Sequence, residues 1–177
     1  MAIVQLDKIL SGVAGNLEHI VIYEDIDTDK QLKNYTNGLF AVAVKLEEGN
    51  REAKKARLAQ PADIDVLLAH APELMYDETK KLREFRNATV ADKEDVANPG
   101  QKYVIRGYRL ALGDILTYTA DLLPSGVAVG DKLSIADGKL VTAAEGANVV
   151  FEVIEDSGNE LDIKEKAFAI QVIQVRA

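Results

Sequence analysis

The feature that most constrains the fold is a succession of short β-prone runs in the second half of the chain. Within it, Asp137-Gly138 separates two alternating runs, and both residues tolerate the positive φ angles of a two-residue hairpin turn. Short strands at close spacing are typical of small barrels and sandwiches. The sequence therefore predicts a mainly β protein, with a small β-barrel or sandwich over residues 100–177. The seven runs, separated by Gly, Asp, Asn and Pro, are Tyr103–Ile105, Tyr108–Leu112, Ile115–Thr119, Lys132–Ala136, Lys139–Ala143, Val149–Ile154 and Ala167–Val175.

A short internal similarity lies inside this region. The sequence Leu112-Gly113-Asp114-Ile115-Leu116-Thr117 is echoed by Val129-Gly130-Asp131-Lys132-Leu133-Ser134. Glycine can adopt the backbone angles of a turn, and aspartate can hydrogen-bond nearby amides. Each pair therefore predicts a turn that leads into a strand, which supports barrel geometry more than ancestral duplication.

The first half of the chain is mixed in character. Ile20–Tyr23, Leu39–Leu46 and Asp65–His70 are apolar runs that predict strands. Arg51–Leu58 has the composition of a helix but is short for one, so helix and exposed strand both remain open. Residues 72–99 form a charged excursion, and Asn98-Pro99-Gly100 predicts the turn that ends it. We expect residues 21–99 to form a mixed α+β region.

The N-terminal segment, residues 1–20, carries apolar residues at three- and four-residue spacings, which predicts a short amphipathic helix or arm. So short a helix must dock on its own domain, the more ordinary arrangement, or on a neighbouring subunit. Asp7 and Lys8 interrupt the apolar pattern, so we do not expect a signal peptide. The candidate interaction residues of this arm are Ile3, Leu6, Ile9, Leu10 and Val13.

Charge and composition bear on the partners. The 29 acidic and 21 basic residues give a net charge of −8, which opposes binding to a phosphate backbone or to an anionic membrane surface. We therefore expect neither nucleic acid nor membrane as a partner. The absence of cysteine excludes disulfides, thiolate metal sites and cysteine nucleophiles. Because tryptophan is also absent, the six tyrosines are the expected aromatic anchors of any interface.

The residues that could carry chemistry form no complete site. Asp25-x-Asp27-x-Asp29 resembles the start of a calcium loop, but Lys30 and Thr36 occupy the positions that need Gly and Glu. A solvated acidic loop is the better interpretation. The two histidines, His19 and His70, have no second ligand at metal-binding spacing. We predict no metal, no cofactor and no catalytic residue, and hence no enzyme.

The region Tyr108–Val175 resembles the small β-barrel head decoration and minor structural proteins of tailed bacteriophages. The resemblance rests on the Gly-Asp strand entries, the Gly-Asp-Lys-Leu step at residues 130–133, the Asp-Gly hairpin followed by Lys-Leu-Val, and the closing apolar strand Phe-Ala-Ile-Gln-Val-Ile-Gln-Val. It implies a non-enzymatic protein that binds the major capsid protein on the outer surface of the virion and cements the shell. It also implies synthesis in the host cytoplasm and a symmetric oligomer, most often a trimer.

Two other classes of protein fit the same sequence. One is a tail, neck or baseplate component of a phage, which would share the β-rich, acidic and cysteine-free profile. The other is a cellular β-barrel module that binds protein; sugar binding is disfavoured because such sites need an aromatic platform that a chain without tryptophan lacks. An enzyme with an unrecognised site is the third class and the least expected.

Overall fold

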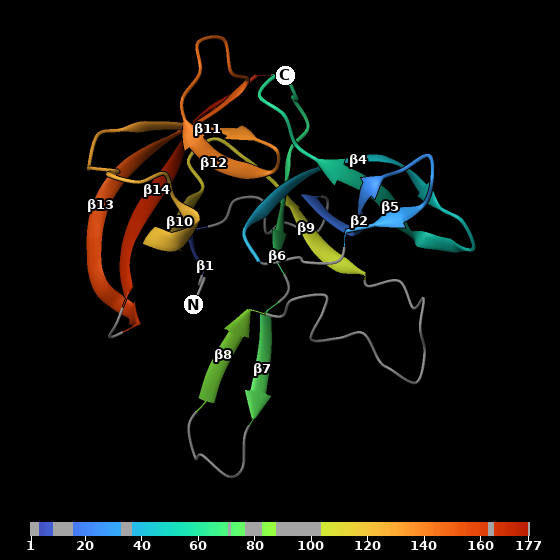
Figure 1. The fold of residues 1–177 in the computed structure, drawn as a ribbon, viewed down its shortest axis with the longest axis horizontal. Helices are drawn as coiled ribbons and strands as arrows, with labels where there is room; N and C mark the ends of the chain where they lie inside the picture. The colour runs from blue at the N-terminus through green and yellow to red at the C-terminus, as the bar shows by residue number, and fades with distance from the viewer. Residues whose placement is uncertain are drawn as a thin grey trace.

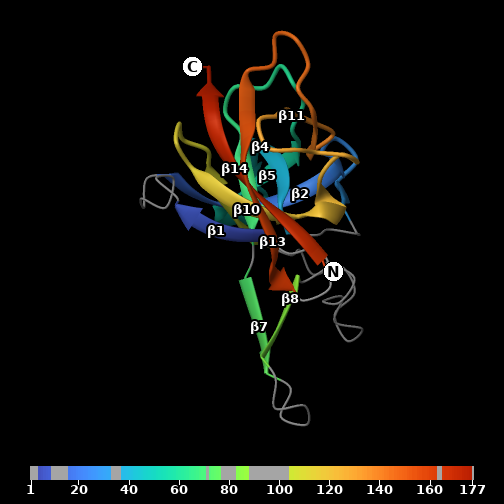
Figure 2. The same ribbon diagram turned by 90° about the vertical axis from the view of Figure 1, so that its left-hand side faces the viewer.

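The computed structural model describes residues 4–8, 16–32, 37–70, 72–76, 83–87, 104–162 and 165–176. Strands make up most of these residues, and their helical structure is confined to the 3-10 turn η4 (Ala120–Leu122) and to Asn16. The prediction of a mainly β protein is confirmed. Figures 1 and 2 show two packed β structures, a closed barrel and a curled sheet, with a separate hairpin that projects from them.

The barrel is built from the first half of the chain and closed by a strand that follows it. Its strands are β2 (Leu17–Asp25), β4 (Leu39–Glu47), β5 (Asn50–Leu58), β6 (Leu67–His70) and β9 (Ile105–Arg109). They are bonded in the order β2-β5-β4-β6-β9, and β9 pairs again with β2 to close the ring. The β2–β5 pair is parallel and the others are antiparallel. A two-residue strand, β3 (Lys30–Gln31), adds to the far end of β2.

The curled sheet contains six strands in the order β1-β10-β14-β13-β11-β12. They are β1 (Val4–Lys8), β10 (Ile115–Thr119), β11 (Lys132–Ala136), β12 (Lys139–Thr142), β13 (Val149–Asp162) and β14 (Glu165–Val175). All of its neighbours are antiparallel, and the long β13–β14 hairpin forms its centre. The projecting hairpin is β7 (Pro72–Tyr76) with β8 (Arg83–Asn87), which pair only with each other (Figures 1 and 2).

Two hydrophobic clusters hold these parts together. The smaller one fills the barrel, and the close packing at Gly107 shows how tight it is: a Cβ there would lie 3.1 Å from Ile20 Cδ1 and 3.2 Å from Leu67 Cδ1. The larger cluster lies between one outer face of the barrel and the curled sheet. It joins Phe40 and Leu68 of the barrel to Leu116, Leu133 and Phe151 of the sheet. The two β structures therefore share one continuous core.

Two predictions about the first half of the chain are wrong. The expected N-terminal helix is instead strand β1, which pairs with β10 at the edge of the curled sheet. The expected mixed α+β region is all β where it is described, and Arg51–Leu58 lies in β5, paired on both sides by β2 and β4. The position of the barrel also differs from the prediction. The sequence predicted a barrel or sandwich in residues 100–177, but the closed barrel is built from strands that lie before residue 110, and most of residues 100–177 form the curled sheet.

Candidate binding surface on the curled sheet

The two Gly-Asp motifs fold into equivalent turns. In the first, the N–H of Asp114 donates to the carbonyl oxygen of Ala111 at 3.1 Å, while a carboxylate oxygen of Asp114 accepts from the N–H of Ala111 at 2.9 Å. In the second, Asp131 and Ala128 make the same two bonds at 3.1 and 2.8 Å. The aspartate in each motif thus closes its own turn, as the sequence pattern predicted.

The glycines of the two motifs attach these turns to the central hairpin of the sheet. Gly113 and Gly130 have φ angles of +90° and +91°, which a residue with a side chain rarely adopts. The N–H of Gly113 donates to the carbonyl oxygen of Val172 in β14 at 2.9 Å, and the N–H of Gly130 donates to that of Val153 in β13 at 2.8 Å. The short sequence echo therefore corresponds to one structural unit used twice.

The equivalence extends into the strands that follow the turns. Ile115 of β10 faces Gln171 of β14, and Lys132 of β11 faces Glu152 of β13. Glu152 and Gln171 also face each other across the β13–β14 pair. The four strands therefore have local twofold pseudosymmetry, with the Glu152–Gln171 pair on its axis.

Each turn presents one aliphatic side chain to solvent. Leu112 precedes the first glycine and is 62% exposed, and Val129 precedes the second and is 56% exposed. Turn positions of this kind usually carry polar residues, so an aliphatic residue at both is a repeated feature of the surface. The pseudosymmetry presents the same apolar chemistry at two places on one sheet.

A groove lies beside β12, one of the two edge strands of the curled sheet. It has a volume of about 590 Å³ and runs between β12, the start of β4 and the segment that contains η4. Its walls are mainly apolar, and Asp121 and Lys139 are its charged residues. The apolar residues that line it are Leu39, Leu122, Leu123, Pro124, Leu140 and Val141.

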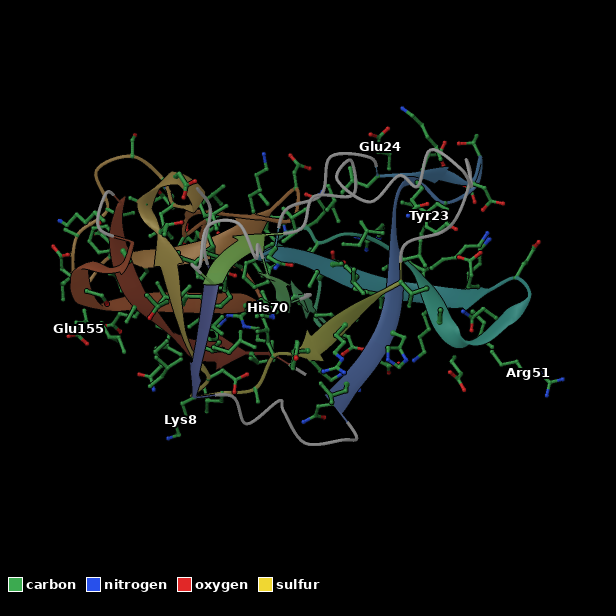
Figure 3. All side chains as sticks on the ribbon, turned by 90° about the horizontal axis from the view of Figure 1, so that it is seen from below. Lys8, Tyr23, Glu24, Arg51, His70 and Glu155 are labelled. Carbon is green, nitrogen blue, oxygen red and sulfur yellow. The ribbon has the colours of Figure 1, made fainter. Side chains whose placement is uncertain are left out.

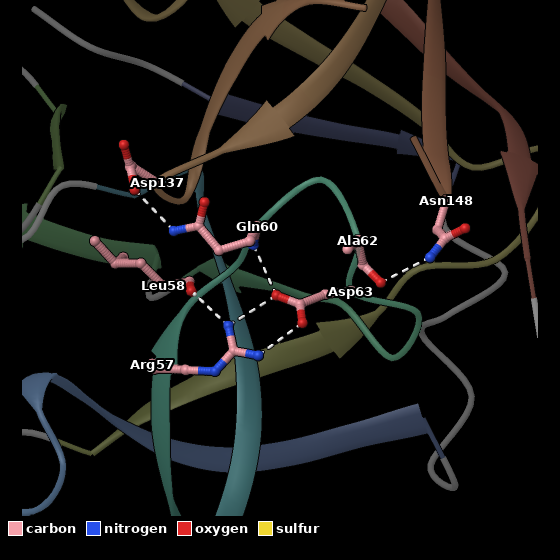
Figure 4. A network of polar contacts seen from close by, with 7 residues as sticks. All are labelled: Arg57, Leu58, Gln60, Ala62, Asp63, Asp137 and Asn148. Atoms are coloured by element: carbon pink, nitrogen blue, oxygen red, sulfur yellow. Dashed lines mark hydrogen bonds and ion pairs between the residues drawn. The ribbon is translucent and has the colours of Figure 1, made fainter. Parts of the chain in front are cut away.

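The turn between β11 and β12 is fixed to the barrel at the end of this groove. The N–H of Phe40 donates to the carbonyl oxygen of Gly138 at 2.8 Å, and the N–H of Gly138 donates to that of Ala59 at 2.9 Å. The side-chain amide of Gln60 also donates to the Asp137 carboxylate at 2.7 Å, as Figure 4 shows. Asp137 and Gly138 have φ angles of 48° and 70°, so the predicted Asp-Gly turn is present.

Charged and polar side chains hold the loop after β5 in place (Figure 4). Two nitrogens of the Arg57 guanidinium donate to the Asp63 carboxylate at 2.8 and 2.6 Å. Burial opposes the charge on Asp63, but the bonds from Arg57 and from the Gln60 N–H outweigh it and lower the pKa of Asp63. The side chain of Asn148 donates to the carbonyl oxygen of Ala62 at 2.7 Å, which ties this loop to the curled sheet.

The candidate interaction arm is described only in part. Leu6 lies in β1, is half-buried and packs against the core between barrel and sheet. Ile3, Ile9, Leu10 and Val13 lie outside the described residues, so their role stays a prediction. Leu6 is turned to the body of its own chain, which corresponds to the more ordinary of the two docking arrangements.

The acidic motif folds into a surface turn. Asp25 accepts hydrogen bonds from the Thr28 hydroxyl at 2.8 Å and from the Asp27 N–H at 3.0 Å, and these bonds lower the pKa of Asp25. Asp29 instead forms an ion pair with Lys55 of β5, which raises the pKa of Lys55. All three aspartates of the motif are exposed, and Asp25 and Asp29 contact different partners.

The two histidines lie in different surroundings. His19 is exposed on β2, whereas His70 is buried at the end of β6. Figure 3 shows His70 in the interior of the molecule, with Arg51 and Glu155 at opposite ends. Burial lowers the pKa of His70. Both histidines face Arg106 of β9, His19 across the β2–β9 pair and His70 across the β6–β9 pair.

Within the described ranges, no group of three or more histidine, aspartate or glutamate side chains is arranged to hold a metal ion. None of the helical structure in the described part of the chain has the length and apolar character needed to cross a membrane.

Comparison with protein-family models, with curated proteins and with solved structures finds no match.

Sequence reasoning found the Gly-Asp turns and the Asp137-Gly138 hairpin but missed the groove. The groove depends on the approach of β4 to β12, which are separated by about a hundred residues of sequence. The one local signal for it was Leu122-Leu123-Pro124, an apolar stretch between two predicted strands.

Proposed function

We propose that this chain is a non-enzymatic structural protein of a tailed-phage virion that binds the major capsid shell and stabilises it. The single observation that carries the proposal is the pair of exposed aliphatic side chains, Leu112 and Val129, on two equivalent turns of one sheet. Two similar small contacts on one body suit a protein that links neighbouring copies of a repeated partner. Linked small contacts raise affinity by avidity and need no large single interface.

The resemblance of Tyr108–Val175 to phage head decoration proteins supports the same proposal, because both Gly-Asp motifs fall within it. The net charge of −8 also favours a position on the outside of a shell, away from packaged DNA. A symmetric oligomer, with a trimer favoured, would multiply the paired contacts further.

The first experiment is co-sedimentation with capsid shells. Purified protein is mixed with expanded shells made from the major capsid protein encoded in the same phage genome, and the shell pellet is analysed. We expect the protein to pellet at a fixed ratio to capsid subunits and to raise the temperature at which the shells break. Protein that stays in the supernatant at all shell concentrations would overturn the proposal.

A pair of variants tests the contact residues. Replacement of both exposed turn residues, Leu112→Ser with Val129→Ser, is expected to weaken shell binding at least tenfold. The matched control is Val44→Ser, since Val44 is a similarly exposed aliphatic residue (54%) on β4 of the barrel. An equal loss of shell binding in both variants would show that Leu112 and Val129 are not the contact residues. Cryo-electron microscopy of virions separates a shell position from a tail, neck or baseplate position.

A further inference from the structure

The outer edge of β12 has backbone groups directed away from its partner strand. β12 pairs with β11 in unbroken register, and Asp137-Gly138 forms the two-residue turn between them. The bond from the N–H of Ala143 to the carbonyl oxygen of Lys132, 2.9 Å long, fixes which positions bond inward. In an antiparallel pair, residues that bond to the partner strand alternate with residues whose N–H and C=O point away from it. Gly138, Leu140 and Thr142 are therefore the outward positions of this strand.

The first of these positions is already paired with the barrel. The N–H and the carbonyl oxygen of Gly138 bond to Ala59 and Phe40, at 2.9 and 2.8 Å. The next two positions face the groove: the N–H and carbonyl of Leu140 and the N–H of Thr142 have no backbone partner among the described residues. A strand in the groove would therefore continue a hydrogen-bonded ladder that the barrel has begun.

The groove has the size and walls for such a strand. Its volume of about 590 Å³ lies within the range of roughly 300–1,000 Å³ that is usual for ligand pockets. Leu39, the first residue of β4, also lines the groove. Apolar residues such as Leu123 and Leu140 would cover the alternate side chains of that chain.

Other free edges of the curled sheet are irregular, and the edge of β12 is not. The far part of β13 extends beyond β11 and has register shifts between Val153 and Glu155 and between Asp156 and Gly158. The pairing of β1 with β10 is shifted between Leu6 and Lys8. Bulges and charges of this kind are how natural sheets prevent unwanted strand addition. β12 has no register shift, which leaves its edge open to a partner.

We propose that β12 receives an extended segment of the capsid-shell protein by strand addition. The segment would carry apolar side chains at alternate positions, to match the mainly apolar lining of the groove. Backbone bonds to Leu140 and Thr142 would supply affinity, and the apolar walls would supply specificity. This inference rests on the proposed function, because it takes the shell protein as the source of the segment.

The decisive variant is Thr142→Pro. Proline removes the outward N–H of an exposed residue at the end of an edge strand, a position where proline is tolerated because no bond within the sheet is lost. Thr142→Ala is the matched control, since it removes the same side chain and keeps the N–H. We expect Thr142→Pro to bind shells at least tenfold more weakly than Thr142→Ala, with the two variants melting within a few degrees of each other.

Hydrogen exchange of the wild-type chain gives a second readout that needs no variant. The probe is the same capsid shell, and we expect the amides of Leu140 and Thr142 to exchange more slowly when shells are present.

Two results would overturn strand addition: unchanged exchange at both amides, or equal shell binding by the two Thr142 variants. In either case, shell binding by the wild-type chain would still uphold the proposed function. Failure of the wild-type chain to bind shells overturns the proposed function itself. The native mass of the protein is also measured without shells. If Thr142→Pro lowers that mass, the groove binds a second copy of this chain, and this inference is overturned.

Discussion

The backbone N–H of Gly138 donates to the carbonyl oxygen of Ala59 at 2.9 Å, so the turn between β11 and β12 is bonded directly to the chain that leaves β5. The bond joins the curled sheet to the barrel through main-chain atoms. There is no room for a side chain at this point: a Cβ on Gly138 would lie 2.7 Å from Leu58 Cδ2 and 2.8 Å from the carbonyl oxygen of Phe40. Gly138 is therefore a tightly packed point of contact between the two β structures.

Gly138→Ala is therefore expected to lower the free energy of unfolding by about 3 kcal/mol, because a steric clash adds to the strain of positive φ. Gly126→Ala is the control: its φ is +80°, yet nothing lies within 4 Å of the added Cβ. That variant should lose only about 1 kcal/mol. Urea denaturation of both variants measures the difference, and equal losses would show that the junction at Gly138 is not tightly packed.

The bidentate pair of Arg57 and Asp63 makes a modest contribution to stability. Arg57→Lys keeps the charge but loses the fork of two donors, and we expect a loss of about 1 kcal/mol. The expected loss is small because the Arg57 side chain is 42% exposed and water screens the ion pair. The control is Lys30→Ala, whose partner Glu24 is on the surface, and its effect should be near zero. Denaturation curves that give the same loss for both would contradict a special role for the fork.

Buried His70 predicts a pH dependence of stability. Its folded pKa lies below the ordinary value of 6.5 because burial disfavours the charged ring, and a contact with the Val4 backbone offsets this only in part. The unfolded chain therefore binds a proton that the folded chain does not. Stability should fall as the pH drops below about 6.5, by at most about 1.4 kcal/mol per pH unit, and be unaffected by this group at higher pH.

His70→Gln is expected to remove that part of the pH dependence, whereas His19→Gln, at an exposed position on β2, should retain it. Nδ1 of His70 has no hydrogen-bond partner among the described residues, and Arg106 faces His70 across the β6–β9 pair. Neither feature would stabilise a protonated ring. Thermal melts between pH 5 and pH 8 test this, and identical profiles for the two variants would refute it.

The phenol of Tyr118 links the curled sheet to the start of β4. Its hydroxyl donates to the carbonyl oxygen of Gly38 at 3.2 Å, in a buried position. Tyr118→Phe should cost about 1 kcal/mol, because that buried bond to the carbonyl is lost. Tyr108→Phe serves as the control on β9, where the ring is half-buried, and should cost less. Denaturation midpoints of the two variants decide the point.

The elements that the sequence predicted well are those in which local signals agree. Lys132–Ala136 forms β11 with the predicted bounds, and Asp137-Gly138 forms the predicted turn. Leu39–Leu46 extends by one residue in β4. In each case, alternating or β-branched side chains are bounded by residues that favour turns. Pairing with distant strands then adds to a preference that the segment already has.

The elements that were missed are those in which distant pairing decides. The apolar spacing around Leu6 fits a helix, yet Val4 and Leu6 also alternate with the polar Gln5 and Asp7 as a strand requires, and pairing with β10 selects the strand. Arg51–Leu58 has a helical composition, but β2 and β4 pair with it on both sides. The closure of the barrel by β9 could not be predicted, because it depends on a strand that follows residues 72–104 in the sequence.

The position of β1 also has a consequence for the order of folding. Leu6 pairs with Leu116, so at ribosomal rates of about 5–20 residues per second the first strand waits on the order of ten seconds for its partner to be made. The barrel is complete once β9 emerges, before the curled sheet exists. During synthesis the barrel would therefore act as the template on which the sheet assembles. Strand β1 would join the sheet late, although it is made before every other strand of that sheet.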